Sequence, residues 1–182
     1  MPEKSKENEP ELESPEKGGN SSSTEKKRRL HIGLDLGTLQ SCFVTKLIKP
    51  GSDEDVGTIV PTIVGYPEDG ILSGILPGNS KMLHGEEAIA NELHLRLVHP
   101  LSDGVVSDLE ATKSFLKYLR GKVDPEFKRE VLCVIGIPAV ADNDAKENLK
   151  KAAKGAFDGI LFIPEPFIAA LGMRDEDRLQ DP

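Results

Sequence analysis

Residues 30–48 decide the fold of this chain, and they read LHIGLDLGTLQSCFVTKLI. Residues 30–35 have the composition of a β-strand, and residues 41–48 form a second run that is rich in β-forming side chains. A turn over residues 37–40 begins with glycine and joins the two runs. Two strands joined by so short a turn are expected to form an antiparallel hairpin.

The hairpin carries the first candidate site, Asp35-Leu36-Gly37-Thr38. A glycine turn lets backbone N–H groups converge on one point, which makes a nest for an anion. Asp35 ends the first strand beside this turn, where its carboxylate would hold Mg²⁺ mostly through water. Thr38 adds a hydroxyl. The same residues also fit an ordinary hairpin turn, and they match neither a Walker A loop nor the dinucleotide-binding fingerprint.

The second half of the chain alternates strands and helices. A continuous apolar run over residues 131–137 ends at Pro138 and predicts a central strand that is buried on both faces. A helix is expected at 143–157, a second buried strand at 159–163 and a last helix at 165–173. This order predicts parallel neighbours joined by right-handed crossovers. Together with the hairpin, it predicts an α/β fold with a mixed sheet flanked by helices.

Smaller elements are expected between these halves. Residues 58–60 and 62–66 have strand composition, and residues 86–98 have apolar side chains at helical spacing. A second helix is expected at 108–119, where Asp108 can cap the first turn. The basic side chains of this second helix are assigned to its solvated face: Lys113, Lys117 and Arg120.

A second candidate site is Glu165, which follows the strand expected at 159–163 and begins the last helix. Ligand sites of open α/β sheets gather at the carboxyl ends of strands. A carboxylate there could orient or deprotonate a water molecule near a bound phosphate. The alternative is an acid that only favours the positive end of the helix dipole.

The composition excludes some classes of function. The chain has 182 residues and a formal net charge of −8, which disfavours nucleic acid as a partner because such binding needs a basic face. No apolar run approaches the roughly 18 residues that span a bilayer, and no signal peptide is visible, so a soluble cytosolic protein is predicted. Residues 1–29 are polar and charged, and we expect a disordered tail. Cys42 and Cys133 are expected to be buried reduced thiols, and no histidine has the spacing of a zinc ligand.

Several blocks spread over residues 30–173 belong together. They are the Asp-Leu-Gly-Thr hairpin, VGYP at 64–67, GEEA at 85–88, PLSDGVVSD at 100–108, IGIPA at 135–139 and the Glu-Pro helix at 165–166. In combination they resemble the superfamily of actin, DnaK-type chaperones and sugar kinases. Within it, the chain is most similar to the bacterial actin-like filament proteins of the MreB and MamK (magnetosome-filament) types.

The resemblance implies domain I of an actin-like ATPase, with a ribonuclease H-like fold. Residues 30–57 and 104–182 would form subdomain IA, and residues 58–103 would form a small inserted subdomain IB that contacts neighbouring subunits in filaments. Residues 1–29 would be the tail.

The resemblance also implies the roles of the candidate residues. Asp35 would hold the Mg²⁺ environment through water, and the amides of Gly37, Thr38 and Leu39 would contact the phosphates of ATP. Glu165 would be the catalytic acid that positions the hydrolytic water.

The resemblance implies a cytoplasmic protein of the cytoskeleton. It would bind Mg-ATP, polymerise with itself and hydrolyse ATP to control filament turnover, including in magnetosome organisation. Magnetosome or membrane-associated adaptor proteins would be further partners.

Three departures from the family qualify this picture. Pro164 stands where the family often has Asn or Ser, and Leu39-Gln40 is unusual after the glycine turn. The second phosphate loop of the family, Asp-x-Gly-x-Gly, is expected soon after residue 180, and the sequence ends at Pro182. We therefore expect weak ATP binding and negligible turnover from this chain alone. The alternative is a half-length, non-enzymatic interaction module that docks on filaments or other proteins.

Overall fold

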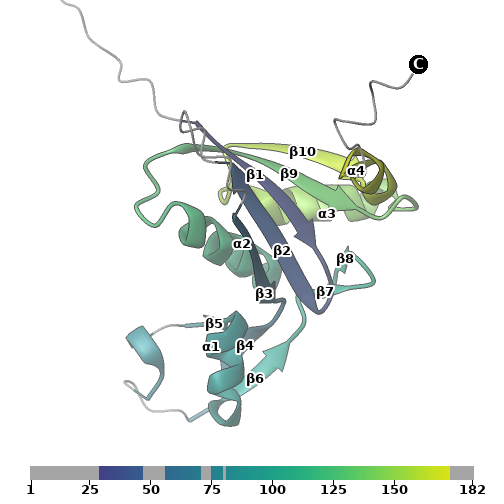
Figure 1. Cartoon of the computed structure of the whole chain (residues 1–182). Coiled ribbons are helices and arrows are strands. Elements are labelled where there is room, and N and C mark those ends of the chain that lie inside the picture. The colour runs from purple at the N-terminus through teal and green to yellow at the C-terminus, as the bar shows by residue number, and fades with distance from the viewer. Residues whose placement is uncertain (1–28, 47–55, 71–74, 80, 173–182) are drawn as a thin grey trace, which may run out of the picture.

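The computed structural model describes residues 29–46, 56–70, 75–79 and 81–172. Figure 1 shows a larger unit built around one sheet and a smaller unit below it. The tail expected at residues 1–29 lies outside the described residues, except for Arg29, which begins the first strand. The last residue of the helix expected at 165–173 lies outside them as well.

The larger unit contains a five-stranded mixed sheet with the strand order β10-β9-β1-β2-β3. Pairing is antiparallel from β1 through β2 to β3, which confirms the predicted hairpin. It is parallel from β1 through β9 to β10. The alternation of strands and helices predicts the parallel pairing of β9 with β10. The strands are β1 (Arg29–Leu36), β2 (Gln40–Lys46), β3 (Val56–Pro61), β9 (Glu130–Ile137) and β10 (Gly159–Pro164).

One face of this sheet forms the main hydrophobic core. Alternate residues of β1, from Leu30 to Leu36, are buried there together with apolar side chains of α2 (Leu109–Val123) and α3 (Asn143–Ala153). Asp108 caps α2 by accepting a hydrogen bond from the amide of Ala111, as predicted. The helix predicted at 108–119 begins one residue later and ends four residues later, at Val123, whereas the one predicted at 143–157 ends at Ala153.

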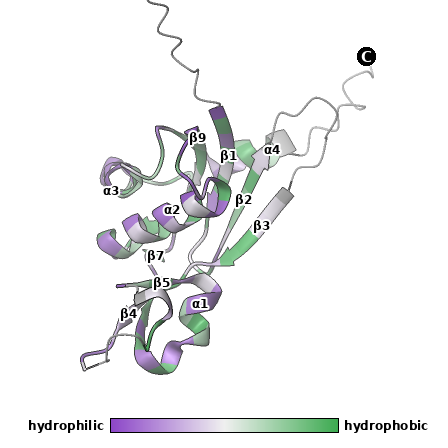
Figure 2. Cartoon of the chain, turned by 90° about the vertical axis from the view of Figure 1, so that its left-hand side faces the viewer, coloured by the Kyte–Doolittle hydropathy of each residue, from purple (hydrophilic) through white to green (hydrophobic). Residues whose placement is uncertain are grey.

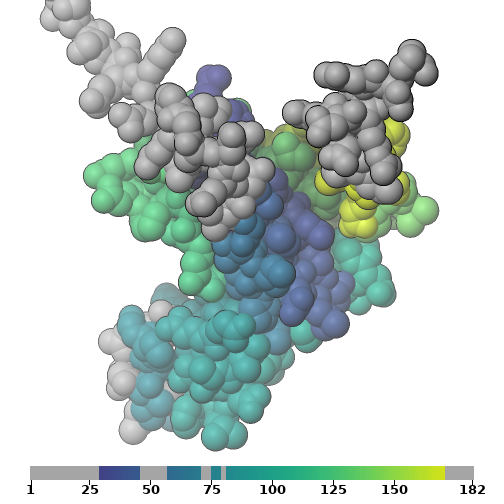
Figure 3. Space-filling view, in the orientation of Figure 1, coloured from purple at the N-terminus to yellow at the C-terminus, as the bar shows by residue number. Residues whose placement is uncertain are grey.

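The opposite face is covered in part by α4 (Glu165–Gly172), the last described helix. Side chains of β1 and β2 form part of the molecular surface on this side in Figure 3. The prediction that residues 159–163 are a buried strand is wrong, because β10 is an edge strand and Leu161 is 57% exposed. On β9, which was also expected to be buried on both faces, Leu132 and Val134 are only half-buried.

The smaller unit has its own three-stranded sheet, in the order β5-β4-β6, and a small core of Leu76, Leu83, Ala88 and Leu95. Its elements are β4 (Val64–Pro67), β5 (Leu83–His84), β6 (Leu95–Val98), α1 (Gly85–Ala90), and the 3-10 turns η1 (Pro77–Asn79) and η2 (Glu92–His94). A hairpin of β7 (Leu101–Ser102) and β8 (Val105–Val106) leads from it to α2.

The single helix predicted at 86–98 is wrong. α1 ends at Ala90, and residues 95–98 form β6, which pairs antiparallel with β4. Leu93, whose spacing from Ile89 and Leu97 suggested a helix, is 89% exposed. The pairing of β6 with β4 buries Leu95 instead, so tertiary contact overrides the local helical pattern.

Arg120 was also assigned wrongly, since it is 5% exposed rather than solvated. Its guanidinium donates hydrogen bonds to the carboxylates of Asp124 and Asp158. It also donates to the carbonyl oxygens of Ala156 and Arg129. A buried arginine is stable only when it is paired in this way.

The expected boundaries of subdomains IA and IB stay a prediction. Residues 58–61, which the expected inserted subdomain includes, pair with β2 as part of the five-stranded sheet. Among the described residues, no helix is long and apolar enough to cross a membrane.

Candidate functional site at the carboxyl edge of the sheet

Three parallel strands end at the same edge of the large sheet. In the register of β1 with β9, Leu34 lies opposite Ile135, and in that of β9 with β10, Gly136 lies opposite Ile163. Asp35 is therefore at the same edge as the start of α4, where Glu165 follows β10. In open α/β sheets, ligands bind at the carboxyl ends of the strands.

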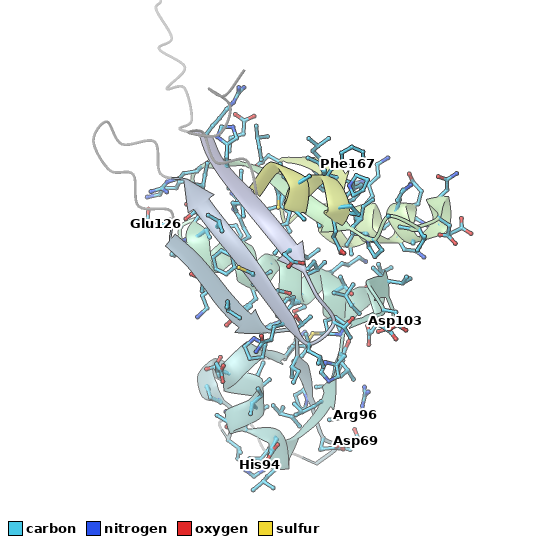
Figure 4. All side chains as sticks on the ribbon, turned by 45° about the vertical axis from the view of Figure 1, so that its right-hand side comes forward. Asp69, His94, Arg96, Asp103, Glu126 and Phe167 are labelled. Carbon is cyan, nitrogen blue, oxygen red and sulfur yellow. The ribbon has the colours of Figure 1, made fainter. Side chains whose placement is uncertain are left out.

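Asp35 and Glu165 also lie on the same face of the sheet. Asp35 alternates with the core residues of β1, so its exposed side chain points to the face that α4 covers. On that face, a Cβ added to Gly136 would lie 3.5 Å from Cγ of Glu165 and 3.9 Å from the carbonyl oxygen of Leu34. Figure 4 shows α4, marked by Phe167, crossing this side of the sheet.

Gly136 is a site residue that the sequence reasoning missed. Its missing side chain leaves the room in which Glu165 and Ile168 approach the sheet, since an added Cβ would lie 3.4 Å from Cδ1 of Ile168. The signal was present in the sequence, because an isolated glycine inside a strand often marks a close approach of another group.

The turn of the hairpin holds the other predicted residues, Gly37, Thr38 and Leu39. Gly37 is required sterically, because a Cβ there would overlap the carbonyl oxygen of Gln40. The carbonyl oxygen of Leu39 accepts a hydrogen bond of 2.9 Å from the amide of Thr62. The turn is thus tight, and its outer side is open to solvent at Leu39.

We expect Gly37→Ala to lower the free energy of unfolding by about 2 kcal/mol, because the new methyl group meets backbone that cannot move without breaking the turn. Gly33→Ala is the matched control, in the strand β1 that precedes the turn. A Cβ at Gly33 has no neighbour within 4 Å, so this change should stay within about 0.5 kcal/mol. Urea unfolding of both variants measures the difference, and equal effects would contradict the steric role of Gly37.

A groove of about 300 Å³ lies next to Asp35. Its lining is mostly apolar and comes from four strands and α4: Gly33, Leu34, Asp35, Cys42, Val44, Val134, Ile163 and Ile168. Figure 2 shows hydrophobic stretches along β2 and β3. Since the groove offers few polar groups, a phosphate would be bound at the turn rather than inside the groove.

The cysteines differ in their surroundings, although both are free thiols. Cys133 is buried as predicted, and burial raises the pKa of its thiol to about 12, so it stays protonated. Cys42 is only half-buried and lines the groove.

Asp35 fits a Mg²⁺ site in which water and the phosphates of a substrate supply the other ligands. Among the described residues, no three or more His, Cys, Asp or Glu side chains gather to form a metal site. Mg²⁺ is commonly held by one or two carboxylates together with water and the phosphates of a substrate. Asp35 beside the glycine turn is compatible with that arrangement.

The sequence of this chain matches a known protein family and two curated proteins. The family model described as MreB/Mbl protein matches residues 29–176. The chain is 32% identical over 152 residues to the actin-like protein MamK of Magnetospirillum gryphiswaldense, covering 81% of this chain and 40% of that protein. MamK of Paramagnetospirillum magneticum is 30% identical, with 81% and 41% covered.

Solved structures agree with this relationship. A MamK double helical filament superposes with a TM-score of 0.68 at 28% identity, covering 80% of this chain and 44% of that chain. A non-polymerising MamK mutant bound to AMPPNP gives 0.66 at 29% identity, with 81% and 44% covered. MreB5 of Spiroplasma citri bound to ADP gives 0.58 at 26% identity, with 79% and 40% covered.

These matches confirm the expected actin-like fold, and the chain spans about 40% of the length of the curated relatives. The family match covers most of the chain, including β1, the hairpin turn and the start of α4. The chain therefore belongs to the MreB/Mbl family of actin-like cytoskeletal proteins.

Proposed function

We propose that this chain supplies the first phosphate site of an actin-like filament protein and binds Mg-ATP there. The observation that carries the proposal is the shared edge of β1, β9 and β10, where Asp35, the glycine turn and Glu165 come to one face of the sheet. Related MamK and MreB5 structures are described as bound to AMPPNP or ADP, which supports nucleotide as the ligand.

Each group has a role that follows from its chemistry. The amides of the turn at Gly37, Thr38 and Leu39 would contact phosphate, as backbone nests do. Asp35 would hold Mg²⁺ through its water shell. Glu165 would orient the attacking water, since phosphoryl transfer depends on positioning and electrostatics.

Self-assembly into a cytoplasmic filament is the second part of the proposal. It rests on the MamK relatives, which are described as filaments. A role in magnetosome organisation, with membrane-associated adaptors as partners, rests on the resemblance of the sequence to MamK-type proteins.

The experiment is titration of the chain with Mg-ATP, followed by NMR shifts of backbone amides. The described residues offer one phosphate turn, so we expect a dissociation constant on the order of millimolar. The largest shifts should occur at the amides of residues 37–39. Asp35→Ala should remove the saturable shifts, because the Mg²⁺ environment is lost. Asp69→Ala is the control, since Asp69 lies exposed in the smaller unit.

Glu165→Ala separates binding from hydrolysis. It should leave the titration unchanged, and in a chain extended by the second half of a MamK relative it should slow phosphate release. Tight binding by the unextended chain would refute the expectation that one phosphate turn binds ATP weakly. Saturation by Asp35→Ala equal to that of the parent would refute the proposed site. A lack of any saturable shift would favour the docking module instead.

A further inference from the structure

Within the described residues, two short segments lead out of the small sheet, one to the large sheet and one to the hairpin of β7 and β8. The first runs from β3 to β4 through Thr62 and Ile63, and the second runs from β6 to β7 through His99 and Pro100. Figure 1 shows both connections where the smaller unit meets the larger one. The position of the small sheet depends on what holds these segments.

Thr62 is held by three hydrogen bonds to three different parts of the chain. Its amide donates to the carbonyl oxygen of Leu39 at 2.9 Å, in the turn of the candidate phosphate site. Its hydroxyl bonds with that of Ser41 at 2.7 Å. Its carbonyl oxygen accepts from Nδ1 of His99 at 3.1 Å, in the second connection. One residue thus joins the turn, β2 and both connections.

Burial makes the hydrogen bond between the hydroxyls of Ser41 and Thr62 costly to break. Ser41 and Thr62 are both 0% exposed, so neither hydroxyl has solvent as an alternative partner. Removing one of them leaves the other as an unsatisfied buried polar group, which is more costly than the bond itself. The pair therefore fixes the distance between the start of β2 and the first connection.

The second connection is itself anchored to α2. The carbonyl oxygen of Pro100 accepts hydrogen bonds of 3.0 Å from the amide of Ser107 and from the hydroxyl of Thr112. His99 is held in the same way, because its carbonyl oxygen accepts from the hydroxyl of Ser107 at 2.8 Å. His99 is therefore held in place, and its hydrogen bond to Thr62 restrains the position of Thr62 and of the turn.

We propose that Thr62 is a positioning residue that couples the turn at residues 37–39 to the junction between the two sheets. A displacement of the turn is then transmitted to the first connection and to the small sheet, and the reverse also holds. The mechanical coupling stands on the hydrogen bonds alone. Its use in sensing a bound phosphate rests on the proposed function.

Hydrogen exchange of the unliganded chain, read by NMR, tests the coupling. Thr62→Val keeps the shape but removes the hydroxyl, and it should raise the exchange rates of amides 41 and 62, which lie at the paired end of the turn, about tenfold relative to the central strands. Thr62→Ser keeps the hydroxyl and should restore slow exchange. Cys133→Ala is the control, because Cys133 is equally buried but lies in β9, outside both connections and the turn.

Each result decides the matter. Faster exchange of these amides in Thr62→Val, but not in Cys133→Ala or Thr62→Ser, supports the coupling. Unchanged exchange of these amides in Thr62→Val, or the same increase in Cys133→Ala, overturns it. If Thr62→Val does not fold, Ser41→Ala removes the other hydroxyl and must give the same local increase.

Titration with Mg-ATP keeps the two proposals apart. If the parent binds, Thr62→Val should bind several-fold more weakly and Thr62→Ser normally. If the parent does not bind, the phosphate site fails, whereas the exchange result still decides the coupling.

Discussion

Replacing Arg120 with alanine is expected to lower the free energy of unfolding by about 3–5 kcal/mol. That is a large share of the stability of an ordinary domain. The reason is the position of the guanidinium at the junction of three segments: the end of α2, the start of β9 and the loop that leads into β10.

The effect is large because the change leaves buried partners behind. The side chains of Arg120 and Asp124 are each 6% exposed, and their ion pair is 3.2 Å long. Without the arginine, the Asp124 carboxylate keeps the amide of Arg129 but loses its counter-charge. The ring of Phe127, whose centroid lies 5.3 Å from the guanidinium carbon, loses the group over which it packs.

Lys113→Ala is the matched control on the same helix. Its ion pair with Glu110 is partly solvated, so its loss should cost no more than about 0.5 kcal/mol. Urea unfolding measures both variants. A loss below about 1 kcal/mol for Arg120→Ala would show that the network contributes little.

Acidification from pH 7.5 to pH 4.5 is expected to destabilise the protein through His84. Burial lowers the pKa of this imidazole from 6.5 to about 4. The ring stacks on Tyr118 with centroids 5.0 Å apart, and its Nε2 lies 2.7 Å from the hydroxyl of Ser114. These contacts join the small sheet to α2 while the ring is neutral.

The direction follows from proton binding. Between these two pKa values the unfolded chain holds a proton on His84 and the folded chain does not, so the free energy of unfolding falls as the pH falls. The contribution is complete above pH 6.5 and is lost progressively toward pH 4. The difference in pKa sets an upper limit of about 3 kcal/mol, which solvent at the exposed edge of the ring reduces to about 2 kcal/mol.

His84→Phe isolates this term, because phenylalanine can stack on Tyr118 without taking up a proton. The loss of stability between pH 7.5 and pH 4.5 should be smaller in this variant by about 2 kcal/mol. His94→Phe changes an exposed histidine of the small unit and should retain the full dependence. Identical pH profiles for His84→Phe and the parent protein would rule out His84 as the cause.

The large sheet could be predicted from the sequence because local signals and tertiary structure agree there. The hairpin from β1 to β2 has a glycine turn, and β9 is an apolar run that a proline ends. The meeting of Asp35 with the start of α4 follows from the parallel order of the strands. Both predicted site positions therefore share one edge, whereas their catalytic roles stay predictions.

The errors arise where distant residues decide the structure. β6 forms because it pairs with β4, and the sequence of residues 86–98 gives no sign of that pairing. Arg120 is spaced like a surface residue of α2, and its burial depends on Asp158, which is 38 residues away. The coupling through Thr62 likewise needs the turn and His99, from two other segments, and each looks ordinary in isolation.

The pairing of β1 with β9 also sets an order of events during synthesis. Arg29 pairs with Glu130, which is 101 residues further along the chain. At a translation rate of roughly 5–20 residues per second, β1 and β2 leave the ribosome about 5–20 seconds before β9. During that interval the inner edge of β1 has no partner strand, so the nascent hairpin offers an open edge to chaperones or to other nascent chains.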